Sequence, residues 1–404
     1  MCGRTNLMAM GRILFGGVIM LTAVGSSPGQ PAAGKKAQAL DRFKQLDRNG
    51  DGKLTAEELN RPELFKEIDK DGDGFVTPEE IRGYFVGLET GPAVKANPNL
   101  ALPPVPPMAK SLDVPYAKIE GVAPKLLSLD IYASSQSVAV ASPSAPRAGE
   151  EGEKPAGKAQ GKGQRNGPVM VYVHGGAWSA GDKAGVGCKP AFFVGKGWVF
   201  ISVNYRLFPA GKHPVNVEDV ARALAWVHGH VGEYGGDPNA IFLMGHSAGA
   251  HLAALAATDG RRLKAAVGPT GAGADLTILK GVVLGDSNAY DVSHLMALLG
   301  GFGTTYDRVF GGDPAVWKDA SPAAFVAKGK SIPPFLLLHA GLPSRTAQAE
   351  NLAKLLKEAG VRAEIFAAPD KNHGTLNADI GKTGDAPTKA MMGFLDSIAG
   401  KSRL

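Results

Sequence analysis

The chain has 404 residues, enough for one large domain and a smaller one, and its hydrophobic fraction of 44% suits a packed core. Lys and Arg number 44 against 38 Asp and Glu, so the formal net charge is only +6. This mild charge comes without a basic stripe interleaved with aromatic residues, which argues against nucleic acid as a partner.

The first 27 residues have the pattern of a secretory signal peptide. Arg4 and Arg12 precede an apolar run at 13–24, and small residues follow at 25–27, where a signal peptidase can cut. The apolar run is short for a membrane span, and an uncleaved membrane anchor is the alternative. We therefore expect a secreted or periplasmic protein without a stable membrane span after cleavage of the signal.

Composition divides the remaining chain into three segments. A compact charged segment covers 37–88, a linker rich in Pro and Ala covers 91–110, and a large domain covers 113–400. The linker is expected to be extended and semi-rigid. Within the large domain, a low-complexity insert at 134–167 has too few apolar residues to pack a core, so we predict a disordered surface loop there.

Two twelve-residue stretches of the charged segment, "DRNGDGKLTAEE" at 47–58 and "DKDGDGFVTPEE" at 69–80, resemble EF-hand loops. Such loops offer oxygen atoms to Ca²⁺ from positions 1, 3, 5, 7, 9 and 12, and they turn sharply at a glycine in position 6. The predicted calcium ligands are Asp47, Asn49, Asp51, Lys53, Thr55 and Glu58 in the first loop, and Asp69, Asp71, Asp73, Phe75, Thr77 and Glu80 in the second.

The two loops form a small helical EF-hand module in this interpretation, with Leu54 and Val76 pairing as a short strand between them. Only "LNRPELFKEI" separates the loops, which is less than in the common sensor pair. A structural or extracellular calcium site is therefore favoured over a signalling role. The alternative is a pair of acidic, solvated loops.

From residue 168 onward, short apolar runs alternate with helical patterns. The runs predict strands at 169–175, 198–205, 240–245, 263–269, 334–341 and 363–368, and the helical patterns lie at 215–231, 248–257, 347–359 and 388–399. Near-continuous apolar strands separated by amphipathic helices predict a mostly parallel sheet with helices on both faces. The segment 277–312 is predicted to form a small lid.

The sequence "GHSAG" at 245–249 fits the pattern G-x-S-x-G, between a predicted strand and a predicted helix. A serine on so tight a turn needs small neighbours, and the following helix N-terminus favours developing negative charge. Ser247 is therefore the candidate nucleophile. "HGGAW" at 174–178 ends another strand, so the N–H groups of Gly176, Ala177 and Ala248 are candidates for an oxyanion hole.

These motifs, with "NYRLFP" at 204–209 and "NHGT" at 372–375, resemble α/β-hydrolases of the esterase and lipase group that carry an HGG-type oxyanion loop. The carboxylesterases related to hormone-sensitive lipase and the kynurenine-formamidase-like enzymes are examples. The resemblance covers about 113–395. It implies an α/β-hydrolase fold, hydrolysis through an acyl-enzyme without a catalytic cofactor, and a general base at His373 after the last strand.

The acid of the triad has no obvious candidate. The resemblance places it after the penultimate strand, but the loop "GLPSRTAQAE" at 341–350 contains no Asp. Asp275, Glu350 and Asp370 are possible substitutes. Asp275 is favoured because it follows the preceding predicted strand, a place that some hydrolases use, and the absence of any triad acid is the other possibility.

The expected function is that of an exported serine esterase of the carboxylesterase type with a calcium-binding module. Its expected substrate is a small-molecule or polysaccharide-linked ester. A peptidase or amidase on the same fold is one alternative. Another is a calcium-binding, non-catalytic protein with a degraded hydrolase site, for which the missing loop acid is the main argument.

Overall fold

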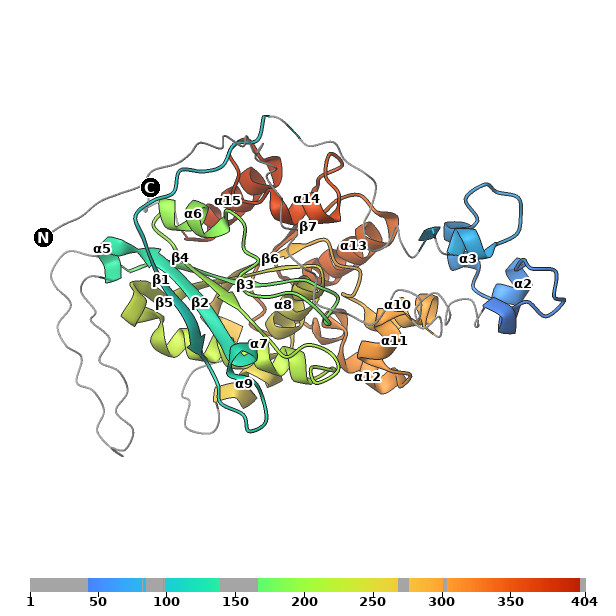
Figure 1. Cartoon of the computed structure of the whole chain (residues 1–404), viewed down its shortest axis with the longest axis horizontal. Coiled ribbons are helices and arrows are strands. Elements are labelled where there is room, and N and C mark those ends of the chain that lie inside the picture. Colours follow the sequence, from blue (N-terminus) through green and yellow to red (C-terminus); the bar gives the residue numbers. More distant parts are fainter. Residues whose placement is uncertain are drawn as a thin grey trace, which may run out of the picture.

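The structure is a computed structural model, and it describes residues 43–81, 83–84, 97, 99–138, 166–267, 276–300 and 304–399 (Figure 1). Eight strands form one sheet in the order β1-β2-β4-β3-β5-β6-β7-β8. They are β1 (Met108–Pro115), β2 (Ser128–Ser134), β3 (Gly167–Val173), β4 (Val199–Val203), β5 (Gly236–His246), β6 (Leu279–Gly285), β7 (Phe335–His339) and β8 (Ala363–Ala367).

The sheet is mostly parallel, as the sequence predicts. β1 pairs with β2 and β2 with β4 in antiparallel fashion, and all pairings from β4 to β8 are parallel. Successive side chains of β3 enter different cores, Val171 on one face and Tyr172 on the other. Both faces of the central strands are therefore buried, which explains why β3, β4 and β7 are almost wholly apolar.

Helices cover both faces of the sheet (Figure 1). α6 (Lys189–Gly195), α14 (His373–Ala378) and α15 (Ala386–Ala399) pack Phe193, Leu376 and Phe394 onto the face that holds Tyr172. α7 (Val215–His230), α8 (Ala248–Thr258), α9 (Gly260–Val267) and α13 (Pro343–Glu358) pack onto the other face. Three short helices, α10 (Val292–Leu299), α11 (Thr305–Phe310) and α12 (Pro314–Asp319), lie between β6 and β7.

One predicted strand is wrong, and this error matters for the site. Residues 263–267 belong to α9, while β6 lies at Leu279–Gly285, inside the predicted lid at 277–312. A central parallel strand at 263–267 would carry Lys264 into the sheet, whereas in α9 that side chain is exposed and Leu263 is buried. The helices α10 and α11 occupy the rest of the predicted lid.

The segment boundaries differ slightly from the expected ones. β1 begins at Met108, within the predicted linker, and Ala101 forms an isolated bridge with Thr383 of the large domain. The insert expected at 134–167 begins with α5 (Ser135–Val138), and its residues 139–165 lie outside the described part of the chain, as does the expected signal at 1–27. Among the described residues, no helix has the length and apolar character to cross a membrane.

In the charged segment, α2 (Ala56–Leu59) begins within the first predicted loop, and α3 (Pro62–Ile68) lies between the two loops. Leu54 and Val76 form the expected bridge, and both side chains are fully buried. In Figure 1 the segment lies beside α10. Arg61 makes this contact by donating hydrogen bonds to the carbonyl oxygens of Leu298 (2.7 Å) and Gly300 (3.0 Å) at the C-terminal end of α10.

Candidate functional site

Ser247 lies on a sharp turn between β5 and α8. Its φ of 57° and ψ of −123° are rare for a residue with a side chain, and such backbone strain is typical of a nucleophile held on a strand-to-helix turn. The Ser247 N–H donates to the carbonyl oxygen of Gly285 at the end of β6 (2.8 Å). A Cβ atom at position 249 would lie 2.1 Å from the Val173 carbonyl oxygen, so only glycine lets α8 start this close to β3.

The predicted oxyanion loop lies directly against this turn. A Cβ atom at Gly175 would approach the Ser247 Cβ to 3.1 Å, so the loop and the serine are in close contact. Gly176 and Ala177 are exposed, and both have positive φ, 119° and 51°. Among the described residues, no backbone oxygen accepts a hydrogen bond from either N–H group. The loop therefore presents two free donors beside Ser247.

Trp178 anchors the oxyanion loop to the helix that begins after Ser247. Its Nε1–H donates to Nδ1 of His251 on α8 (3.1 Å), and because a carbonyl can only accept, the His251 Nε2–H donates to Ala320 (2.7 Å). Burial lowers the pKa of His251 to about 3, so its ring is neutral. Trp178 also packs against the rings of Tyr306 and Phe310. These contacts hold the positive-φ backbone of the loop in place.

His373 is the first residue of α14 and lies next to the nucleophile turn. Its ring is 4.4 Å from that of His246, the residue before Ser247, and its carbonyl oxygen accepts a hydrogen bond from His246 Nε2 (2.9 Å). The His373 Nδ1 atom lies 2.7 Å from the Oδ2 atom of Asp286. Because a carboxylate only accepts, Nδ1 carries the proton, which leaves Nε2 of the neutral ring free to act as a base.

Asp286 follows the last residue of β6 and is fully buried. Three groups hold its carboxylate: His373, the Ala340 N–H on Oδ1 (3.0 Å) and Arg345 Nη1 on Oδ2 (2.9 Å). Burial acts to raise the pKa of Asp286, but the hydrogen bond from His373 and the charge of Arg345 lower it to about 2. Asp286 is therefore a permanent carboxylate that orients the imidazole of His373.

The sequence did not reveal this acid. Asp275 lies outside the described residues. Within the described part of the chain, the carboxylate that forms a hydrogen bond and an ion pair with His373 belongs to Asp286 and not to Glu350 or Asp370. Asp286 directly follows the apolar run "GVVLG". Ser247 and the loop at 174–178 also follow apolar runs, so the position of Asp286 after such a run is the sequence pattern that indicates it. The sequence pattern predicts this strand at 263–269 and therefore places the run "GVVLG" in the lid, which hides Asp286.

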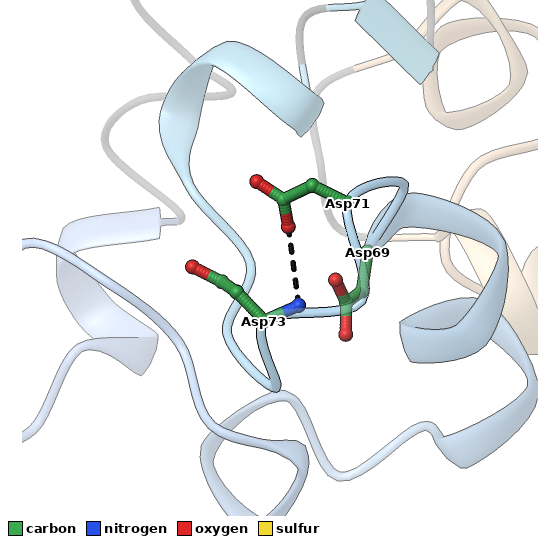
Figure 2. Close-up of side chains that lie close together, drawn as sticks. All are labelled: Asp69, Asp71 and Asp73. Atoms are coloured by element: carbon green, nitrogen blue, oxygen red, sulfur yellow. Dashed lines mark hydrogen bonds between the residues drawn. The ribbon is translucent and has the colours of Figure 1, made fainter.

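The EF-hand loops arrange their carboxylates in the same way twice. Asp69, Asp71 and Asp73 place oxygen atoms within 4.8 Å of one another, and Figure 2 shows the three side chains gathered at one loop, with the Asp73 N–H bonded to Asp71. Glu80 closes this loop by accepting from the N–H groups of Lys70 and Thr77. Hard oxygen donors at this spacing fit Ca²⁺.

The first loop repeats the pattern. The Asp47 carboxylate accepts from the N–H groups of Gly50 (2.8 Å) and Gly52 (2.9 Å), and Asn49 contacts Asp51. Glu58 accepts from the N–H of Thr55 (3.0 Å), which together with the Thr55 hydroxyl lowers the pKa of Glu58. In the second loop, burial acts to raise the pKa of Glu80, but hydrogen bonds from the Thr77 N–H and hydroxyl lower it overall, so the closing glutamate of each loop has a lowered pKa.

A surface groove of about 700 Å³ lies elsewhere, between α7 and α9, and includes Trp226 in its lining. Its described lining shares no residue with the site around Ser247. Its arginines are already paired with carboxylates, as in Arg222 with Asp219 (2.8 Å) and Arg261 with Asp259 (2.7 Å). The groove therefore offers little free positive charge to an anionic ligand.

Comparison with protein families identifies both segments. Residues 159–353 match the BD-FAE family model, and residues 40–61 and 63–86 match the model of the EF hand. Esterase LipQ of Mycobacterium tuberculosis is 31% identical over 251 residues, which is 59% of this chain and 57% of LipQ. Esterase LipC of the same organism is 30% identical over 244 residues, 57% of this chain and 58% of LipC. The chain thus spans less than two thirds of the length of these relatives.

Solved structures confirm the fold. Esterase B from Lactobacillus rhamnosis superposes with a TM-score of 0.54 at 20% identity, covering 74% of this chain and 87% of that one. A bifunctional GH43-CE protein from Bacteroides eggerthii gives a TM-score of 0.52 at 22% identity, with 72% of this chain and 38% of that chain covered. Together with the sheet order, these likenesses show that the predicted α/β-hydrolase fold is correct.

Proposed function

We propose that the chain, which matches the BD-FAE family model over 159–353 and the EF-hand model over 40–61 and 63–86, is a serine hydrolase that cleaves carboxylic esters through an acyl-enzyme. The observation that carries this proposal is the contact of His373 Nδ1 with the buried Asp286, beside the strained turn of Ser247. A base oriented by an ionised carboxylate next to a nucleophile is the arrangement that acyl transfer requires.

In the proposed reaction, Nε2 of His373 takes the proton of the Ser247 hydroxyl as its oxygen attacks the ester carbonyl. The N–H groups of Gly176, Ala177 and Ala248 stabilise the negative charge that develops on the carbonyl oxygen. His373 then gives the proton to the leaving alcohol. Water attacks the acyl-enzyme in the same way, which releases the carboxylic acid and restores Ser247.

We propose esters of short acyl groups as substrates, either small molecules or acetyl groups on a polysaccharide. Export and the esterase relatives support this class. A peptidase or amidase remains the second candidate, because the same three residues serve amide hydrolysis as well. The degraded-site alternative loses its main argument, since an ionised carboxylate is present at His373 although the loop after β7 has none.

The purified protein tests the proposal through a fluorophosphonate probe and matched chromogenic substrates. We expect the probe to label the peptide that contains Ser247, as mapped by mass spectrometry, and p-nitrophenyl acetate to be hydrolysed much faster than the corresponding p-nitroanilide. Faster cleavage of the anilide would favour the amidase. No labelling of the wild-type protein would contradict a serine hydrolase of either kind.

We also propose that both EF-hand loops bind Ca²⁺. The ligands would be Asp47, Asn49, Asp51, Lys53, Thr55 and Glu58, and Asp69, Asp71, Asp73, Phe75, Thr77 and Glu80, with Lys53 and Phe75 contributing carbonyl oxygens. The match to the EF-hand model and the clustered carboxylates support this. Because the segment contacts α10 through Arg61, calcium binding is expected to stabilise the contact rather than supply chemistry to the reaction.

Calcium binding is expected to raise the stability of the protein measurably. Binding to the folded state alone stabilises it by about 2.7 kcal/mol when free Ca²⁺ is 100 times the dissociation constant. Isothermal calorimetry should detect two sites, and the double variant Asp47→Ala with Asp69→Ala should lose the binding heat and the thermal shift together. An unchanged isotherm in that variant would refute the assignment of these ligands.

We further propose that the protein is exported by its N-terminal signal and acts in the periplasm or outside the cell. The support is the sequence pattern at 1–27, in which basic residues precede a short apolar run and small residues follow it. Calcium concentrations there suit EF-hand sites of modest affinity.

A further inference from the structure

One oxygen of Asp286 has two nitrogen donors within hydrogen-bond distance. Its Oδ2 atom lies 2.7 Å from His373 Nδ1 and 2.9 Å from Arg345 Nη1. We propose that Arg345 is a positioning residue that holds Asp286 as a carboxylate aimed at His373 and sets the low-pH limit of the reaction. This inference rests on the proposed serine-hydrolase function, and it adds a fourth residue to the three that perform the chemistry.

Burial explains why the carboxylate needs a permanent partner. The Asp286 side chain is 0% exposed and that of Arg345 is 5% exposed. In the resting enzyme His373 is neutral, and an unpaired carboxylate at such a depth is strongly unfavourable. A guanidinium stays protonated at any working pH, so Arg345 balances the charge of Asp286 throughout the reaction cycle. His373 balances it only while its ring is protonated.

The connection after β7 supplies two of the groups that hold Asp286, one of which is Arg345. Arg345 lies in the first turn of α13, which follows β7, and the Ala340 N–H from the same connection holds the other oxygen of Asp286. This connection is the one where the family resemblance places the triad acid. Here the carboxylate comes from the end of β6, and the loop after β7 supplies a cation and a backbone donor to it.

Arg345 also acts on the base itself. Burial lowers the pKa of His373 below its ordinary value, the hydrogen bond with Asp286 raises it, and the positive charge of Arg345 lowers it. The other titratable groups packed here are uncharged: His246 on β5, whose pKa burial holds well below the usual range, and Tyr290 after β6, whose pKa burial raises. Asp286 and Arg345 are therefore the charged groups that tune His373.

The sign of the effect follows from the role of the base. His373 accepts a proton only when its ring is neutral, so activity appears as the pH rises through its pKa and is lost as the pH falls below it. Arg345 lowers that pKa and extends activity to lower pH. Removal of its charge should move the acid limb of the pH profile upward.

The test compares Arg345→Gln and Arg345→Lys with the wild type and with Arg362→Gln, which removes an exposed arginine paired with Glu364. kcat/KM for p-nitrophenyl acetate and the rate of fluorophosphonate labelling are measured between about pH 4.5 and pH 9. We expect Arg345→Gln to move the acid limb of both profiles upward by about one pH unit. Arg362→Gln should leave the profiles unchanged.

Arg345→Lys separates charge from geometry. Lysine keeps the positive charge but lacks the planar fork, so the acid limb should stay at the wild-type pH while kcat falls by about tenfold. A uniform loss of activity in Arg345→Gln without movement of the limb would reduce Arg345 to a structural role. If Arg345→Gln does not fold, Arg345→Lys provides the test. A wild-type kcat in Arg345→Lys, together with an acid limb at the wild-type pH, would overturn the proposal. Labelling of Ser247 in the wild-type protein distinguishes either result from failure of the proposed function.

Discussion

Replacing Ser247 by alanine is expected to lower kcat by about 10⁶-fold, the loss typical of removing the nucleophile of a serine hydrolase. The acyl-enzyme cannot form without the Ser247 oxygen, and the remaining activity reflects the oxyanion donors acting on water. The fold should persist, because Ala248 and Gly249 still begin α8 and the deleted hydroxyl is only half-buried. Initial rates of p-nitrophenyl acetate hydrolysis measure the loss of kcat, and circular dichroism checks that the variant is folded.

Ser397→Ala is the matched control for this variant. Ser397 lies on α15, and its hydroxyl donates to the Phe394 carbonyl oxygen within the same helix (2.6 Å). Ser397→Ala also removes a serine hydroxyl oxygen, but at a position far from Ser247 in the sequence. The variant should keep the wild-type rate of p-nitrophenyl acetate hydrolysis and the wild-type labelling by the fluorophosphonate probe. If Ser247→Ala retains hydrolysis at a comparable level, a different residue is the nucleophile and the assignment of Ser247 is wrong.

Replacing Asp286 by asparagine is expected to lower kcat by about 10⁴-fold. An amide in place of the carboxylate can donate to His373 Nδ1, which then favours the ring form with the proton on Nε2, where it cannot accept one from Ser247. The change also leaves the buried Arg345 without its counter-ion. Breaking a buried ion pair on one side destabilises a protein by about 3–5 kcal/mol, so urea unfolding should show a loss of that order.

The same substitution at Asp275 separates the two candidate acids. If Asp286 serves His373, Asp275→Asn should retain most of the activity. Asp291→Asn is a further control, because Asp291 caps α10 in the same connection and asparagine caps a helix about as well as aspartate, so both activity and stability should stay near the wild-type values. Wild-type activity in Asp286→Asn together with a large loss in Asp275→Asn would reverse our assignment.

The sequence predicted most of the parallel strands from their short apolar runs. β3, β4, β5, β7 and β8 all follow apolar runs, and the order of the motifs led to the correct fold. The exceptions have physical causes. The second residue of β6 is the exposed Lys280 and the third is Gly281, so β6 has a weaker strand pattern than the apolar stretch at 263–267. That stretch is helical because α9 exposes its charged residues and buries Leu263.

Local chemistry was also readable in the short motifs. The glycines around Ser247, the "HGG" loop and the two EF-hand loops each need particular residue types within a few positions, so the pattern itself carries the prediction. The structure brings Ser247, the loop at Gly175 and His373 together as those motifs suggest. Their catalytic and metal-binding roles stay predictions until the variants above are measured.

The sequence by itself determined the α/β-hydrolase fold, the turn that carries Ser247 and the calcium-loop pattern, because each depends on residues that are neighbours along the chain. Only the tertiary structure decided which carboxylate serves His373 and what balances its charge. Asp286, Arg345 and His373 come after β6, β7 and β8, and Arg345 and His373 lie 59 and 87 positions from Asp286 in the chain. Their meeting depends on strand order, which places the ends of β6 and β7 side by side.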